Sequence, residues 1–390
     1  MYHFIMRKLL ILIFALPLGL NAWTCQAKPK PQIDQAQKDA EFRQLFTNAF
    51  AQWDVNHDGK LDLKEINAVI ENPQIHGDEA AIAVIFHAHI PVNDEGDIGN
   101  LTLDQVLALA VDPQEQKKIS RKSRHIQTFN HSLFLPDDPN LLNFRQGRMS
   151  DCYLLAAVGA FVYNNPKTTV RAMITPQADS GFNVQFGNGK IVKVGPMTDA
   201  ELEMGVSEGQ NRGYWLSVLE KAYAELRKEK KEEQNGREFE ADETVFANFI
   251  GHGGTCAPVM EAFTGYQTAK APIKEWRKED PQAVAEKTHQ LLTMISKQHR
   301  LMTAGTGGDK TIKLPKGIPH KHAFGILDYN PANRMVKLFN PWGNHVKPSG
   351  PPGPVNGYPT EHGIFEVPLD EFLQIFGGFI YQTDKLAAAH

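Results

Sequence analysis

An apolar run from Cys152 to Tyr163, CYLLAAVGAFVY, constrains the fold of this chain more than any other segment. The run has no proline and only one glycine, so it is predicted to form a buried helix. Ser150 and Asp151 come directly before it and are residue types that cap helices. The chain is therefore expected to build a core around a helix that begins near Cys152.

A cysteine at the start of a helix can serve as a nucleophile. The helix dipole and the unbonded N–H groups of the first turn favour a thiolate there. Gln146 lies six positions upstream of Cys152, where its amide could donate to an oxyanion together with the backbone N–H of the cysteine. A lone cysteine at such a position is more often an inert apolar residue. The catalytic interpretation therefore requires partner residues elsewhere.

Candidate partners lie in the segment 320–342. Two β-rich stretches flank the sequence Asn-Pro-Ala-Asn, which predicts a hairpin turn. With the turn centred on its Pro-Ala pair, His322 lies opposite Pro341 and Asn340 is its near neighbour. A cysteine, a histidine and an asparagine that orients the imidazole make up the Cys-His-Asn triad of papain-like chemistry.

These residues and several further motifs resemble the calpain family of cysteine proteases over roughly residues 140 to 380. The resemblance implies a papain-like α+β fold, with a helical half carrying Cys152 and a β-rich half carrying His322 and Asn340. It also implies an endopeptidase that acts on protein or peptide substrates. The motifs that carry the likeness are Gln146-Gly147 through Cys152, WLSVLEKAYA at 215–224, Gly253-Gly254, Phe263-Thr264-Gly265, His322-Ala323, Asn340-Pro341-Trp342-Gly343 and GIFEVPLDEFLQIF at 363–376.

A second motif occupies residues 54–65, DVNHDGKLDLKE. Gly59 stands at the sixth position, where a calcium-binding EF-hand loop turns sharply, and oxygen ligands recur at the spacing of such a loop. The predicted calcium ligands are Asp54, Asn56, Asp58, the backbone carbonyl of Lys60, Asp62 and Glu65. A second stretch, 94–105, has lost ligands and is expected to pack against the first loop through a short β-bridge.

The order of these motifs predicts five segments. The first 27 residues contain two basic residues, an apolar run and a small-residue cleavage site, which together indicate a signal peptide and an exported, periplasmic or secreted protein without a membrane anchor after cleavage. The expected segments are the signal peptide at 1–27, an all-α EF-hand module at 28–113, a basic linker at 114–125, a protease subdomain with Cys152 at 126–253 and one with His322 and Asn340 at 254–390.

Composition narrows the possible functions without fixing the oligomeric state. A net charge of −4 gives no excess of basic residues for binding nucleic acid. Two other functions stay open: an acyl transferase on the same fold, and a non-catalytic calcium-responsive binding protein.

Cys256 is expected to be a buried apolar residue, with a reversible disulfide to Cys152 as the alternative.

Overall fold

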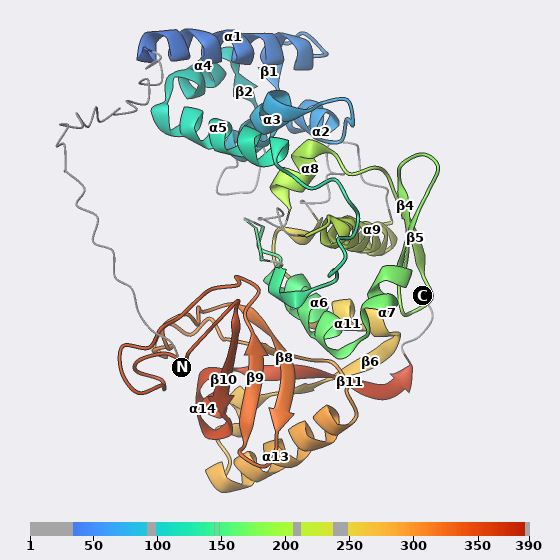
Figure 1. Ribbon diagram of the computed structural model, residues 1–390, viewed down its shortest axis with the longest axis vertical. Coiled ribbons are helices and arrows are strands. Elements are labelled where there is room, and N and C mark those ends of the chain that lie inside the picture. The colour runs from blue at the N-terminus through green and yellow to red at the C-terminus, as the bar shows by residue number, and fades with distance from the viewer. Residues whose placement is uncertain are drawn as a thin grey trace, which may run out of the picture.

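The computed structural model describes residues 34–91, 99–143, 145–147, 149–205, 212–236 and 249–386. The signal sequence expected at 1–27 and positions 94–98 of the second loop lie outside these residues. The fold mixes helices and sheets in three consecutive bodies: an N-terminal helical module, a central helical body and a β-rich body (Figure 1). Within the described part of the chain, no helix is both long and apolar enough to cross a bilayer.

The described residues of the N-terminal module form five helices and a two-stranded sheet. The strands β1 (Lys60–Leu61) and β2 (Leu101–Thr102) pair antiparallel, with Leu61 opposite Leu101, so the predicted short β-bridge is confirmed. Each strand runs into a helix that begins with a capping box, Asp62 with Glu65 and Thr102 with Gln105. The helices are α1 (Gln35–Trp53), α2 (Leu63–Ile70), α3 (Gly77–His89), α4 (Leu103–Val111) and α5 (Pro113–Gln127).

Residues 114–125 do not form the predicted linker, because they make up most of helix α5. The Asp112 side chain caps this helix by accepting from the backbone N–H groups of Gln114 and Glu115. Ile119 and Ile126 lie two turns apart and are both buried. The few apolar residues of this stretch therefore share one face, which packs on the module.

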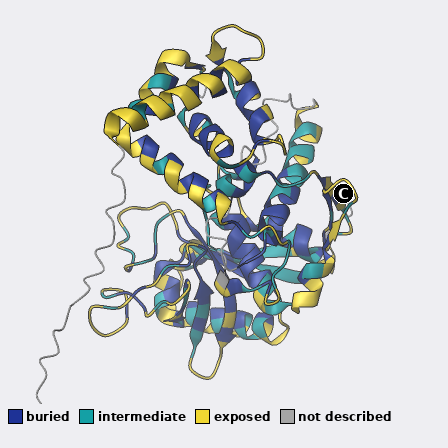
Figure 2. Ribbon diagram, turned by 45° about the horizontal axis from the view of Figure 1, so that its top comes forward, coloured by how far each residue is buried: buried dark blue, intermediate teal, exposed yellow. Residues whose placement is uncertain are grey.

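The central body surrounds the predicted helix α6 (Cys152–Asn164), which is buried from Tyr153 to Phe161. Figure 2 shows the buried residues gathered where the central helices meet the large sheet, while the outer helices of the N-terminal module are largely exposed. The other elements of this body are α7 (Lys167–Ala172), β3 (Ile174–Pro176), β4 (Phe182–Gln185), β5 (Ile191–Val194), α8 (Asp199–Met204), α9 (Trp215–Asn235) and α11 (Cys256–Thr264).

The boundary predicted between residues 253 and 254 is displaced in the structure. Helix α11 follows this point, yet Val259, Met260 and Phe263 pack into the same core as α6. The core of the β-rich body begins at Ala271. The glycine pair at the predicted boundary therefore lies inside the first core region and does not divide the two bodies.

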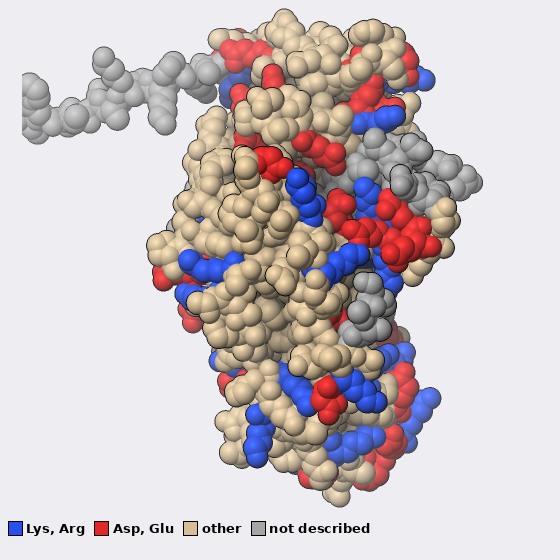
Figure 3. Space-filling view, turned by 90° about the vertical axis from the view of Figure 1, so that its right-hand side faces the viewer, with Lys and Arg blue, Asp and Glu red and all other residues tan. Residues whose placement is uncertain are grey.

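The β-rich body is a six-stranded antiparallel sheet in the order β10-β9-β8-β7-β11-β6, with α13 and α14 packed against it (Figure 1). On the face of the whole molecule that Figure 3 draws, basic and acidic side chains are intermixed. The strands are β6 (Tyr266–Ala271), β7 (Met302–Gly305), β8 (Ala323–Asn330), β9 (Met335–Phe339), β10 (Ile364–Pro368) and β11 (Gly378–Leu386), and the helices are α12 (Ile273–Trp276), α13 (Pro281–Lys297) and α14 (Leu369–Ile375).

The predicted β8–β9 hairpin forms, but its register differs from the prediction. Asn330 pairs with Met335, so the turn contains four residues and not two. An irregularity between Ile326 and Asp328 then shifts the pairing by one, and Gly325 lies opposite Phe339. The bulge compensates in part for the longer turn, which is why the ends of the two strands still meet near the expected positions.

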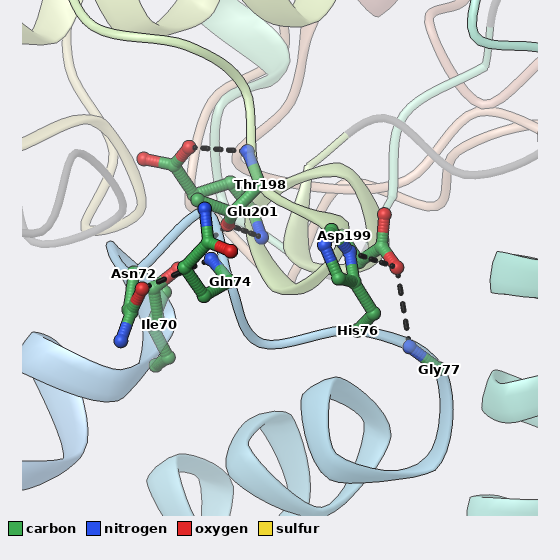
Figure 4. Close-up of polar contacts among 8 residues, drawn as sticks. All are labelled: Ile70, Asn72, Gln74, His76, Gly77, Thr198, Asp199 and Glu201. Carbon is green, nitrogen blue, oxygen red and sulfur yellow. Dashed lines mark hydrogen bonds and ion pairs between the residues drawn. The ribbon is translucent and has the colours of Figure 1, made fainter.

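Helix α8 joins the N-terminal module to the central body (Figure 4). The Thr198 hydroxyl donates to the Ile70 carbonyl over 2.6 Å, and the Asp199 carboxylate accepts from the Gly77 N–H over 3.1 Å. Lys122 of α5 forms an ion pair with Glu203 at 2.8 Å, and both side chains are largely buried. The module is therefore attached through specific polar contacts.

Candidate active site

Cys152 is the first residue of α6, as predicted, and is partly buried. Its sulfur accepts a hydrogen bond from the backbone N–H of Ala323, and the N–H groups of Cys152 and Tyr153 also act on it. Burial raises the pKa of the Cys152 thiol, and these three N–H groups oppose the rise without cancelling it. The N–H groups at the helix terminus lower the pKa of the thiol, as predicted. The net shift is nevertheless upward, so the expected preference for a thiolate is not found.

His322 lies directly before β8 and is 6% exposed. Its Nε2 lies 2.8 Å from Oδ1 of Asn340, which follows β9 and is fully buried. The structure therefore brings His322 and Asn340 together, as predicted. Because Ala323 follows His322 and its N–H reaches the Cys152 sulfur, all three predicted triad residues meet at one place.

The orientation of the Asn340 amide fixes the proton on the imidazole. Oδ1 also accepts from the backbone N–H of Trp342 at 3.0 Å, and Nδ2 donates to the carbonyl of Gly317 at 3.2 Å. Oδ1 is thus the acceptor that faces His322, so Nε2 carries the proton and Nδ1 has a lone pair. Burial lowers the pKa of His322 to about 4, although the bond to Asn340 acts against it.

The hydrogen bond between Asn340 and Gly317 was not identified from the sequence. Gly317 belongs to a loop with no predicted role, and its positive φ of 87° is a conformation that glycine adopts readily. The Trp342 ring lies 4.7 Å from the His322 ring, between centroids, and is 44% exposed. The indole therefore covers one side of the imidazole.

Gln146 lies beside the triad residues, and hydrogen bonds hold both its backbone and its side chain in place. Its N–H donates to the Pro341 carbonyl at 2.8 Å, next to Asn340. Its side-chain Nε2 donates to the Met149 carbonyl at 2.6 Å. The amide is thus close to the nucleophile, but in this conformation it is turned toward the protein.

Cys256 is 6% exposed and forms no disulfide with Cys152. Burial raises the pKa of the Cys256 thiol to about 12, and a hydrogen bond with Thr303 opposes the rise only in part. This thiol is therefore protonated at neutral pH and poorly reactive. The structure favours the expectation of a buried apolar residue over the disulfide alternative.

The predicted calcium loop connects α1 to α2, and Gly59 adopts a positive φ of 77° at its turn. Asp54 accepts from the N–H groups of Asp58 and Gly59, and Glu65 accepts from those of Val55 and Asp62. Oxygen donors of these types suit calcium. In the described ranges, however, no three His, Cys, Asp or Glu side chains converge as a metal site. The loop thus contains oxygen ligands of the types that calcium prefers, but in this structure the Asp54 and Glu65 carboxylates accept hydrogen bonds from the backbone of the loop itself.

Comparison with known proteins establishes the family. A profile described as "Calpain family cysteine protease" matches residues 103–351, which is more than half of the chain, so the chain belongs to the calpain family of cysteine proteases. Calpain-B of Drosophila melanogaster is 27% identical over 292 residues, covering 65% of this chain and 28% of that protein. Calpain-1 catalytic subunit of Rattus norvegicus is 25% identical over 294 residues, covering 67% and 37%. The chain thus spans about a third of the length of these relatives.

Proposed function

We propose that this protein is an exported cysteine endopeptidase that hydrolyses peptide bonds with Cys152, His322 and Asn340. The observation that supports this most strongly is the 2.8 Å contact between His322 Nε2 and Asn340 Oδ1, next to a residue whose N–H reaches the Cys152 sulfur. Membership of the calpain family supports the same chemistry. Protein or peptide chains are the corresponding substrates.

In the proposed first half-reaction, the neutral thiol and the neutral imidazole form the resting pair. The lone pair on His322 Nδ1 takes the thiol proton as the Cys152 sulfur attacks the peptide carbonyl carbon. The resulting oxyanion accepts from the Cys152 N–H and from the Gln146 amide, which must turn one N–H toward the substrate. The imidazolium then gives its proton to the leaving amine, and a thioester with Cys152 remains.

In the second half-reaction, His322 takes a proton from water, and the resulting hydroxide attacks the thioester carbonyl. The carbon–sulfur bond breaks, the acid product leaves, and Cys152 recovers a proton from the imidazolium. Asn340 keeps Nδ1 directed toward the sulfur throughout, because its own amide is fixed by Gly317 and Trp342. The burial of the pair excludes water that would weaken these interactions.

A product assay tests this proposal. An unlabelled peptide mixture incubated with the protein should give free carboxyl and amine products, with and without an added primary amine. A peptidyl epoxide should label Cys152 and leave Cys256 unmodified, because Cys152 is partly exposed whereas Cys256 is buried. Amide products formed with the added amine would instead indicate an acyl transferase. Intact peptides and unlabelled Cys152 would indicate a non-catalytic binding protein.

We also propose that the loop 54–65 binds calcium as an EF-hand and that the chain is exported by its first 27 residues. The donor set of the loop supports the first proposal, and the signal-like composition supports the second. Calcium would be held by Asp54, Asn56, Asp58, the Lys60 carbonyl, Asp62 and Glu65, and would offset the repulsion among their carboxylates. Extracellular sites of this kind often bind calcium at about 10⁻⁴–10⁻³ M.

Calcium is expected to raise the melting temperature of the protein, and Glu65→Ala should abolish most of that increase. Glu65 supplies the twelfth, bidentate position of the loop, and a ligand that binds only the folded state stabilises it by mass action, about 2.7 kcal/mol at a hundredfold excess over Kd. Differential scanning calorimetry with calcium and with chelator measures the effect. Gln105→Ala, at the equivalent position of the second loop, is the matched control. A calcium shift retained in Glu65→Ala would place the site elsewhere.

A further inference from the structure

A cavity of about 430 Å³ lies in the central body, next to the first turn of α6. Its walls come from α9, from the turn between β4 and β5 and from α11, and Tyr153 of α6 also lines it. The described residues that line the cavity include neither Cys152 nor His322. The proposed reaction therefore gives this cavity no role.

The lining of the cavity carries an excess of positive charge. Lys190 forms an ion pair with Glu229, which does not line the cavity. In the described part of the chain, no carboxylate pairs with Lys230 or Lys231, and the Lys231 Nζ lies 5.4 Å from the centre of the Phe249 ring. Such a cavity attracts anions. The charged side chains that line it are Lys190, Arg227, Lys230, Lys231 and Glu233.

Arg227 is partly buried, and its hydrogen-bond partners are neutral. Its Nη1 donates to the Gly253 carbonyl at 3.1 Å and to the Tyr153 hydroxyl. No carboxylate among the described residues forms an ion pair with this guanidinium. Because both hydrogen bonds use Nη1, the N–H groups of Nε and Nη2 are left for a ligand. This edge of a guanidinium matches the two oxygens of a carboxylate or a phosphate.

The uncharged part of the lining is largely apolar. Leu226 of α9, Pro258 and Ala262 of α11 and the side chain of Tyr223 contribute to it. Apolar walls with a few polar groups that fix orientation are typical of sites for small molecules. A ligand that matches this cavity therefore has an apolar body beside its negative charge.

We propose that this cavity is a binding site for an oxyanion, either a carboxylate or a phosphate, attached to a small apolar body. Arg227 binds the oxyanion through Nε and Nη2, and Lys230 and Lys231 attract it over a longer distance. Nη1 keeps its hydrogen bonds to Tyr153 and Gly253, so the ligand binds without releasing the residue that follows the nucleophile.

The oxyanion has two candidate sources, because the cavity adjoins the start of α6. It can belong to an acidic residue of a bound peptide substrate, or to a free small molecule. The first source rests on the proposed endopeptidase function, whereas the second does not.

Titration calorimetry of the full chain with phenyl phosphate tests the site, at about pH 7.5, where the phosphate is doubly charged. Benzyl alcohol, which has the ring without the phosphate, is the control ligand. We expect one phenyl phosphate to bind per chain. Arg227→Gln should weaken binding about tenfold or more, because it removes a charged hydrogen-bonding partner. The double variant Lys230→Gln, Lys231→Gln should weaken it about fivefold.

Lys228→Gln is the matched control, because it removes the same charge from the same helix but does not line the cavity. Its affinity should stay within about twofold of the wild type. Equal affinity in the wild type and Arg227→Gln, an equal loss in Lys228→Gln, or heat no larger than that of benzyl alcohol would overturn the proposal. If Arg227→Gln fails to fold, the double lysine variant decides, and an affinity equal to that of Lys228→Gln would overturn it.

Sequencing the peptides cleaved from an unlabelled mixture distinguishes the two sources. Enrichment of Asp and Glu at one position relative to the cleaved bond, lost in the double lysine variant and kept in Lys228→Gln, identifies a substrate residue. In that case phenyl phosphate should raise KM and leave kcat unchanged. Bound phenyl phosphate without such enrichment identifies a free small molecule. An absence of cleavage would contradict only the proposed endopeptidase function, because the calorimetry does not require turnover.

Discussion

Cys152→Ala should lower kcat for peptide hydrolysis by about four to six orders of magnitude, the scale seen when an enzyme loses its nucleophile. Alanine has no atom that can form the thioester, while the surrounding amides and the imidazole stay in place. His322→Ala should be comparably damaging, because the proton of the thiol then has no acceptor. Asn340→Ala should cost less, since it removes only the group that orients the ring. A fluorogenic peptide substrate followed at saturating concentration gives each kcat.

Cys256→Ala is the matched control for these variants. It also removes a cysteine thiol, from helix α11, but one with no proposed part in the reaction. Its activity should stay close to that of the wild type, and the melting temperatures of Cys152→Ala and the wild type should agree. Cleavage by Cys152→Ala that survives removal of contaminating proteases would rule out Cys152 as the nucleophile.

The local parts of the site could be predicted from the sequence. The apolar run after Asp151 was sufficient to predict a buried helix with Cys152 at its start, and the turn between two β-rich stretches was sufficient to bring His322 near Asn340. The exact register was not predictable, because the four-residue turn and the irregularity near Ile326 depend on how β8 packs in the sheet. The longer turn and the irregularity shift the register in opposite directions, so His322 and Asn340 still lie close to their predicted positions.

A long-range charge partner explains the error at residues 114–125. Residues 114–125 were predicted to be a basic linker, yet Lys122 forms an ion pair with Glu203 in α8 and His125 hydrogen-bonds with the same carboxylate. Burial alone would raise the pKa of Glu203, but the hydrogen bond with His125 and the charge of Lys122 hold it below its ordinary value. The partner lies about eighty residues away in the chain, so no local pattern indicates it.

The distance between α6 and β8 determines whether the two halves of the site meet, and Gly325→Ala is expected to increase it. A Cβ at Gly325 would lie 2.8 Å from the carbonyl oxygen of Ala156, a backbone atom of α6 that cannot turn aside. Inserting a methyl group into such a contact typically costs about 1–3 kcal/mol. Because Cys152 and His322 stand at the starts of these two elements, a shift of about 1 Å between them should lower kcat about a hundredfold.

Gly305→Ala, in the neighbouring strand β7, is the matched control for this prediction. Its Cβ would be 3.9 Å from the nearest atom, the His322 carbonyl oxygen, which is an ordinary contact. The control should therefore retain both its stability in a urea titration and its activity, whereas both should fall in Gly325→Ala. If Gly325→Ala were as stable and as active as Gly305→Ala, the close approach of α6 to β8 would not be what aligns Cys152 with His322, and the alignment would have to come from the loops around Gln146 and Gly317.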